Sequence, residues 1–210
     1  MADYYIRCAD EYHRQTFFLD PSSFLLPLAE KLPPGALILD VGCGSGRDLL
    51  WFKNRGFRVL GFELSYPLAS LARRIVGCEI IVGDFERFDF SPVHADGLLL
   101  VGALVHIPHG ALARVLGNIL PAIKPQGFAL LSMKEGCGFS QDSYGNTFYY
   151  WTDEKLRKLF ETLALEPLHM QRQVSLKNRQ DVWLSYVLKK RQVHGRALVD
   201  AHGLQEAGSR

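Results

Sequence analysis

The residues with the clearest chemical meaning follow a short apolar segment near the start of the chain. Residues 36–39 are apolar, Asp40 comes next, and glycine then occurs at three alternate positions, Gly42, Gly44 and Gly46. Such a turn after a buried strand can take a positive φ, bring bare backbone close to a ligand and pack tightly against the following helix. A helix beginning near Arg47 would point free N–H groups at an anionic part of that ligand. The run therefore predicts a loop that holds a nucleotide cofactor.

Two acidic positions follow at spacings that suit such a cofactor. Glu63 ends the apolar segment 57–62, 23 positions after Asp40, where a carboxylate can accept hydrogen bonds from both ribose hydroxyls. Asp84 and Phe85 follow the apolar segment 78–82, 21 positions after Glu63. There a carboxylate can bind the adenine amino group while the aromatic ring covers the base.

These segments resemble class I S-adenosylmethionine-dependent methyltransferases over nearly the whole chain. The motif at 38–48 (ILDVGCGSGRD) carries the resemblance, and 104–108 (LVHIP) and 132–136 (SMKEG) are similar in a group of small, largely uncharacterised bacterial methyltransferases. The resemblance implies that Asp40 and the loop glycines hold the methionine end of the cofactor. The cofactor contacts that it implies are Tyr12, Asp40, Gly42, Cys43, Gly44, Gly46, Arg47, Glu63, Leu64, Asp84, Phe85, Val101 and Gly102. It specifies S-adenosylmethionine as cofactor, with S-adenosylhomocysteine as product, but not the methyl acceptor.

A nicotinamide-dependent dehydrogenase is the main alternative for a glycine loop of this kind. Its G-x-G-x-x-G pattern, counted from Gly42 and Gly44, would need a glycine where this chain has Arg47. An aspartate two residues before the first glycine suits a cationic amino group rather than a pyrophosphate. The pattern favours the methyltransferase, and a glycine turn in another α/β fold remains the other alternative.

Candidate acceptor-binding residues lie where further strands are expected to end. His106 follows the apolar strand 97–101 and has the pKa range of a general base, although it can instead pack or hydrogen-bond to order its loop. Lys134 ends the strand 128–133 and can attract an anionic acceptor or pair with an acid. Tyr149 and Tyr150 can cover a planar acceptor or belong to the core.

Two further aromatic residues can also be interpreted either as site residues or as packing residues. Tyr12 lies in an N-terminal segment that, in many proteins of the resembled family, folds over the cofactor, but it can equally pack on the domain as part of an amphipathic helix. Trp183 lies in the last expected strand, and we predict it to be a core residue rather than a site residue.

Composition and charge narrow the class of protein. The chain has 210 residues, enough for one domain with a single core, and 24 basic against 22 acidic residues leave a net charge of +2. Neither the overall composition nor the net charge favours nucleic acid or a membrane as a partner. The four cysteines lack metal-ligand or disulfide spacing, no metal is expected, and the first residues lack the apolar core of a signal peptide. We therefore expect a soluble cytoplasmic protein, monomer or homodimer.

Strand and helix patterns alternate along the chain, which predicts an α/β fold with a mostly parallel sheet covered on both faces. The patterns include a strand at 37–41, a helix at 66–76 capped by Ser65, a helix at 110–123 with a turn at 124–127, and a glycine-rich loop at 136–145 before the aromatic cluster 148–151. We expect an N-terminal helical cap at 1–35, the main domain at 36–190 and a tail, flexible by its composition, at 191–210. The resemblance adds a Rossmann-like three-layer sandwich with seven strands in the order 3-2-1-4-5-7-6 and the last strand antiparallel.

The resulting prediction is an S-adenosylmethionine-dependent methyltransferase that acts on a small molecule. In-line methyl transfer from a sulfonium requires mainly alignment and exclusion of water, so no universal catalytic residue is expected. The alternatives are methylation of RNA, and a cofactor-binding module without turnover.

Overall fold

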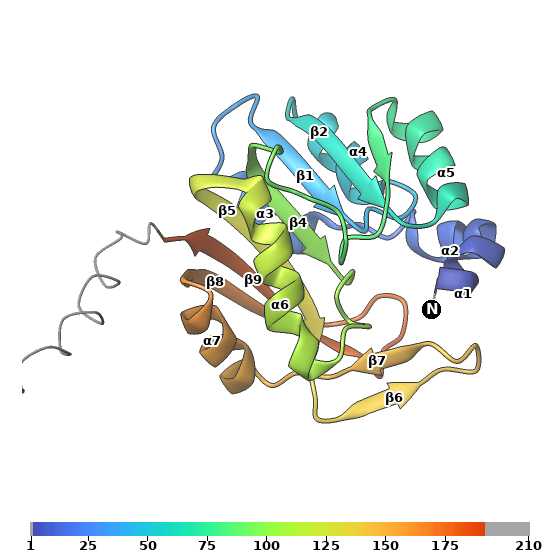
Figure 1. Ribbon diagram of the computed structural model, residues 1–210. Helices are drawn as coiled ribbons and strands as arrows, with labels where there is room; N and C mark the ends of the chain where they lie inside the picture. The colour runs from blue at the N-terminus through green and yellow to red at the C-terminus, as the bar shows by residue number, and fades with distance from the viewer. Residues whose placement is uncertain (1, 192–210) are drawn as a thin grey trace, which may run out of the picture.

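The protein is described by a computed structural model that covers residues 2–191, with side chains from Tyr4 onward. Of the tail expected at 191–210, only Arg191 falls within the described residues. A seven-stranded sheet forms the centre of the molecule (Figure 1). Its strands are β1 (Leu37–Val41), β2 (Arg58–Glu63), β3 (Ile80–Val82), β4 (Ala95–Val101), β5 (Ile123–Lys134), β8 (Leu165–Val174) and β9 (Val182–Lys190).

The strand order is β3-β2-β1-β4-β5-β9-β8, which confirms the predicted order because β8 and β9 are the sixth and seventh strands of this sheet. The first five strands pair in parallel, and β9 runs antiparallel to both of its neighbours. The labels β6 (Phe139–Gln141) and β7 (Thr147–Tyr149) belong to a separate antiparallel hairpin. The hairpin lies within the stretch 136–149, which the sequence indicated only as a glycine-rich loop and an aromatic cluster.

Helices cover both faces of the sheet (Figure 1). They are α1 (Ala2–Arg7), α2 (Ala9–Thr16), α3 (Ser22–Ala29), α4 (Arg47–Lys53), α5 (Tyr66–Val76), α6 (His109–Ile119) and α7 (Asp153–Thr162). Alternate residues of one strand point to opposite faces, so Ile38 packs with the core under α3 and α4, while Leu39 packs with the core under α6 and α7. The result is the expected three-layer sandwich.

Two predicted boundaries were wrong for local reasons. The helix expected at 110–123 ends at Ile119, and Pro121 lies in a 3₁₀ turn, η1 (Leu120–Ala122). The turn expected at 124–127 lies within β5, where the pairing shifts from Ala95 with Ile123 to Gly97 with Phe128. Gln126 takes a positive φ of 64° in this bulge, so the turn signal marked an irregularity in a strand.

Helices α1 and α2 lie beside the edge at which β1 and β2 end (Figure 1). The Ser65 hydroxyl, at the start of α5, donates a 2.8 Å hydrogen bond to the Tyr5 carbonyl of α1. A 2.9 Å hydrogen bond joins His13 Nδ1 of α2 to the Ser45 hydroxyl in the glycine loop. The N-terminal helices are thus tied to the loops that follow β1 and β2. No helix within residues 2–191 is long and apolar enough to cross a membrane.

Candidate functional site

A cavity of about 390 Å³ opens at the carboxyl edge of the sheet, where open α/β folds bind ligands. It lies between the glycine loop, the ends of β4, β5 and β9, helices α1 and α2, the turn of the β6–β7 hairpin and the β8–β9 loop. The predicted site residues on its lining are Tyr12, Asp40, Gly42, Cys43, Gly44, Arg47, Val101, Gly102 and Lys134. Those outside the lining are Gly46, Glu63, Leu64, Asp84, Phe85, His106, Tyr149 and Tyr150.

Each glycine of the loop is required for a different reason. A Cβ on Gly42 would lie 2.6 Å from the Ala103 side chain, and one on Gly44 would lie 3.3 Å from the Tyr12 ring. Gly46 turns away from the cavity and precedes α4 with a φ of 88°. A Cβ there would lie 2.6 Å from Val76 of α5. The first two glycines therefore shape the cavity wall, and the third allows α4 and α5 to pack closely.

Asp40, on β1, is only 3% exposed and lines the cavity. Its carboxylate has no hydrogen-bond or ion-pair partner among residues 4–191, the part of the chain with described side chains. Burial, reinforced by the nearby Asp48 carboxylate, raises the pKa of Asp40 well above its usual range. A buried carboxylate without a donor is costly to keep ionised, so this position suits a cationic ligand group.

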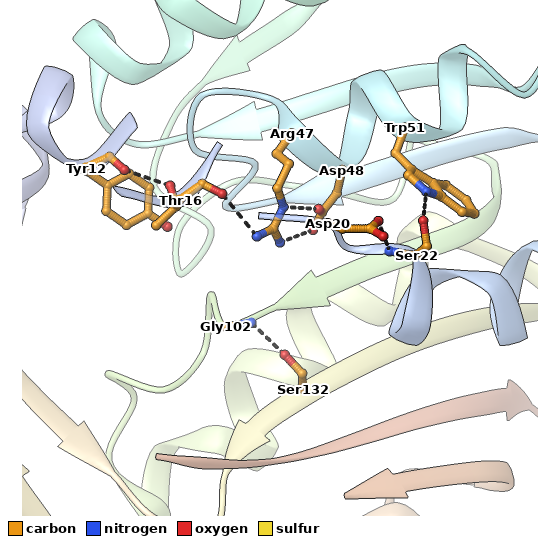
Figure 2. A network of polar contacts seen from close by, with 9 residues as sticks. All are labelled: Tyr12, Thr16, Asp20, Ser22, Arg47, Asp48, Trp51, Gly102 and Ser132. Carbon is orange, nitrogen blue, oxygen red and sulfur yellow. Dashed lines mark hydrogen bonds and ion pairs between the residues drawn. The ribbon is translucent and has the colours of Figure 1, made fainter. Parts of the chain in front are cut away.

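Arg47 and Asp48, the first residues of α4, form a bidentate ion pair (Figure 2). Arg47 donates to the two Asp48 oxygens at 2.6 and 3.1 Å, and its remaining amino group donates to the Thr16 carbonyl at 3.4 Å. This contact joins the end of α2 to the start of α4. The Arg47 charge is consequently balanced within the protein.

Glu63 lies at the end of β2, directly beside the glycine loop. Its carboxylate accepts 2.8 Å hydrogen bonds from the backbone N–H groups of Gly44 and Ser65. Burial raises the pKa of Glu63, and these hydrogen bonds oppose the rise. The structure therefore brings Glu63 to the loop, as the spacing predicted, but next to the cavity and not on its lining.

The residues expected around adenine lie farther along the same edge. Asp84 follows β3, accepts a 2.9 Å hydrogen bond from the Glu86 N–H and forms a 3.7 Å ion pair with Arg87. Phe85 packs against the core under α6, and Leu64 is 41% exposed. Their role in binding a base stays a prediction.

His106 follows β4 and contacts the cavity only through another residue. Its Nδ1 lies 2.6 Å from the Thr147 carbonyl, which can only accept, so Nδ1 carries the proton. The neutral ring then offers Nε2 as an acceptor, and the Tyr5 hydroxyl donates to it at 2.9 Å. Burial lowers the pKa of His106, which favours this neutral form. Tyr5 lines the cavity and His106 does not.

The Lys134 charge on the opposite side of the cavity is balanced within the protein. Lys134 Nζ, at the end of β5, lies 2.9 Å from the Asp181 carboxylate and 4.1 Å from the centre of the Phe148 ring. Two buried serines, Ser132 and Ser185, face each other on β5 and β9 and also line the cavity.

The aromatic residues that the sequence suggested for this side, Tyr149 and Tyr150, lie outside the cavity lining. Phe148 and Trp183 line the cavity, whereas Tyr149 packs against His109 and the Tyr150 hydroxyl hydrogen-bonds Ser140. Neighbouring strand residues face opposite sides, so a run of aromatics cannot all face one cavity. The two serines within apolar strands were a usable signal that the sequence analysis missed. Asp181 and Lys177, in the β8–β9 loop, gave no such signal.

The comparisons with known proteins bear on this geometry. Residues 38–127 match the family model of a methyltransferase domain. The fold is similar to Burkholderia thailandensis 1,6-didemethyltoxoflavin-N1-methyltransferase, solved with its named substrate and S-adenosylhomocysteine, with a TM-score of 0.73, 24% identity and coverage of 90% of this chain and 85% of that one. The segment 38–127 is therefore similar to methyltransferase domains, and the fold is one that known methyltransferases share.

A further fold neighbour is magnesium protoporphyrin IX methyltransferase from Synechocystis, solved with S-adenosylhomocysteine. Its TM-score is 0.71 at 14% identity, with coverage of 90% of this chain and 97% of that one. At these identities the likeness concerns the fold alone.

Curated relatives of the methyltransferase domain differ widely in their named acceptors. The tRNA (carboxymethyluridine(34)-5-O)-methyltransferase of Arabidopsis thaliana is 28% identical over 50% of this chain and 25% of its own length. The dTDP-4-amino-2,3,4,6-tetradeoxy-D-glucose N,N-dimethyltransferase of Saccharopolyspora spinosa is 32% identical over 48% of this chain and 41% of its own length. The chain thus spans less than half the length of either relative.

Proposed function

We propose that this protein binds S-adenosylmethionine in the cavity beneath α1 and α2 and transfers its methyl group to a small, uncharged organic molecule. The observation that carries the proposal is the buried Asp40 carboxylate, which faces the cavity without a partner among residues 4–191. The cofactor has an α-ammonium group at its methionine end. A charge-assisted hydrogen bond from that group would stabilise the ionised form of Asp40.

The remaining residues fit the cofactor. Gly42 and Gly44 leave the backbone bare where the methionine end would lie, and Tyr12 covers Gly44 from α2. The two oxygens of Glu63 each accept one backbone N–H and retain a second lone pair for a ribose hydroxyl. We assign Asp84, Phe85 and Leu64 to the adenine end, on the same edge of the sheet.

The protein's contribution to the reaction in this proposal is alignment and exclusion of water. When bound, the cofactor supplies a methyl group already activated by the positive sulfonium. Helices α1 and α2 shield that position from solvent, and the ends of β4, β5 and β9 form the wall against which the acceptor is held. His106 is the candidate base, and the Tyr5 hydroxyl lies between its Nε2 and the cavity.

The acceptor side favours a small, neutral molecule. The Lys134 and Asp181 charges balance each other, and Asp142 accepts hydrogen bonds from Asn146 and Tyr144. Phe148 and Trp183 offer apolar contact, while Ser132 and Ser185 offer hydroxyl groups. A charged acceptor would find the Lys134 and Asp181 charges already paired with each other.

RNA is the second candidate acceptor, because several relatives are named as tRNA methyltransferases, among them a Bos taurus protein that is 36% identical over 35% of this chain and 16% of its own length. The near-neutral net charge of +2 favours the small molecule. A methyl-transfer assay with each acceptor distinguishes the two candidate functions.

Calorimetry with S-adenosylmethionine, and with NAD as the contrasting ligand, tests the cofactor. We expect S-adenosylmethionine to bind with a dissociation constant on the order of micromolar and NAD not to bind. Transfer of labelled methyl into a metabolite extract, with total tRNA assayed in parallel, then tests the acceptor. Label in a small neutral compound supports the proposal. Label only in tRNA contradicts the acceptor, and cofactor binding without label in either fraction supports a module without turnover.

A further inference from the structure

Two ionic side chains on the cavity lining have no hydrogen-bond or ion-pair partner among residues 4–191, and they carry opposite charges. One is Asp40 and the other is Lys177, in the loop between β8 and β9. The other ionic side chains of the lining are Asp20, Arg47, Asp48, Lys134, Asp142 and Asp181, and each of them has a hydrogen-bond or ion-pair partner. The cavity therefore presents one negative and one positive group to a ligand.

Lys177 extends from the β8–β9 loop toward Tyr12, the residue that covers the glycine loop. Its Nζ lies 5.6 Å from the centre of the Tyr12 ring, and the same ring covers Gly44. The side chain is exposed at the cavity mouth, but burial of its ammonium group lowers the pKa of Lys177, and the nearby Lys134 charge adds to the effect. An anionic ligand group close to the Lys177 ammonium would raise its pKa again.

The loop that carries Lys177 is held in place by its own hydrogen bonds. The Ser175 hydroxyl accepts from the N–H groups of Lys177 and Asn178, and the Ser175 N–H donates to the Asp181 carbonyl at 2.8 Å. The Asp181 side chain in turn binds Lys134 at the end of β5. Lys177 is thus presented by a turn anchored to the sheet.

We propose that Lys177 binds the α-carboxylate of S-adenosylmethionine while Asp40 binds the α-ammonium group. This inference rests on the proposed function and deepens it, because it assigns a carboxylate partner from the acceptor-side loop. The two other cations on the lining are poor candidates. Arg47 is paired with Asp48 and Lys134 with Asp181, so either would have to give up a carboxylate to take another.

The assignment also links the two halves of the site. Strand β9 places Trp183 and Ser185 on the acceptor wall, and the β8–β9 loop directly before it carries Lys177. A bound methionine carboxylate would therefore hold this loop over the cavity. Cofactor binding and completion of the acceptor pocket become one event.

The test compares two protein forms and two ligands that differ only in the carboxylate. Calorimetry measures the binding of S-adenosylmethionine and of decarboxylated S-adenosylmethionine to the wild type and to Lys177→Gln. We expect the variant to bind S-adenosylmethionine about tenfold more weakly, the effect of losing one charge-assisted hydrogen bond. We expect it to bind the decarboxylated compound as tightly as the wild type or more tightly, because a positive charge has been removed. Lys177→Arg should retain most of the affinity for both.

Arg179→Gln is the matched control, because it removes one positive charge from the same loop at an exposed position outside the lining. It should leave both affinities within about twofold, since exposed charges at a distance are screened. An unchanged affinity of Lys177→Gln for S-adenosylmethionine overturns the assignment. An equal loss for both ligands, or an equal loss in Arg179→Gln, overturns it as well. Absence of binding by the wild type would instead refute the proposed function.

Discussion

The two sides of the cavity are built in different ways. The glycine-loop side comes from residues 40–48, contiguous in sequence, and it leaves the Asp40 carboxylate without a partner among residues 4–191. The acceptor side comes from residues spread between Ser132 and Ser185, and its buried charges pair with each other. The first side is therefore prepared for a charged group that the protein itself does not supply. On the second side Lys134 and Asp181 balance each other, and the exposed Lys177 side chain extends toward Tyr12 on the first side.

The largest expected effect concerns the backbone of the glycine-loop side. Gly46→Ala places a Cβ against Val76 and Ala72 at a positive φ, and we expect the free energy of unfolding to fall by about 3 kcal/mol, of which the left-handed backbone costs roughly 1–2 kcal/mol. Urea unfolding measures this. Gly110→Ala is the matched control, because nothing lies within 4 Å of its Cβ position, and it should not destabilise the protein. Equal stability of the two variants would contradict this account of the loop.

The next effect concerns the acceptor side. His106→Ala should lower kcat by about 100-fold on the acceptor found by methyl-transfer screening, because a general base typically contributes at least that factor. The affinity for S-adenosylmethionine should change less than twofold, as His106 is off the cavity lining. Tyr5→Phe removes the hydroxyl that lies between His106 and the cavity, and it should reduce kcat in the same way. A fully active His106→Ala would show that the histidine only orders its loop, through the hydrogen bond to the Thr147 carbonyl.

A smaller effect separates binding from stability on the glycine-loop side. Asp40→Asn should weaken S-adenosylmethionine binding by about 2 kcal/mol, roughly 30-fold, because it removes one partner of a charge-assisted hydrogen bond. The same variant should melt at a higher temperature without cofactor. The folded-state pKa of Asp40 is raised, so its ionised form opposes folding at neutral pH. If Asp40→Asn keeps both the affinity for S-adenosylmethionine and the melting temperature of the wild type, the cofactor binds elsewhere.

The smallest effect is a pH dependence of cofactor affinity. In the free protein the pKa of Asp40 is raised, and an ammonium partner lowers that pKa on binding. Near the raised pKa, binding therefore releases a proton, and affinity falls as the pH drops below the raised pKa, by at most about tenfold per pH unit. Calorimetry in buffers of different ionisation enthalpy measures the released proton. Asp40→Asn should show no such release. Proton uptake by the wild type would reverse the assigned sign and contradict the role of Asp40.

The two sides also differ in how far sequence reasoning reached them. The strand from Leu37 to Val41, the helix from Tyr66 to Val76 with its Ser65 cap, and the strand order were predicted correctly. Asp40 and the glycines could be found because neighbours in sequence remain neighbours in a turn. Glu63 was placed beside the loop because parallel strands end on one edge.

Sequence analysis did not identify the residues of the acceptor side, because only the fold brings them close together. Trp183 was predicted to be core, yet the antiparallel pairing of β9 with β5 sets it opposite Lys134 on the cavity wall. The Asp181 partner of Lys134 lies 47 positions away, and Tyr5 meets His106 across 101 positions. No local pattern encodes such distances.

What the sequence alone determined is the glycine loop and the succession of strands and helices along the chain, because backbone geometry and hydrophobic period act over a few residues. The tertiary structure decided which side chains face the cavity, which charges balance each other and where Tyr5 separates His106 from the cavity. Those outcomes depend on strand pairing and helix docking, which bring distant parts of the chain together.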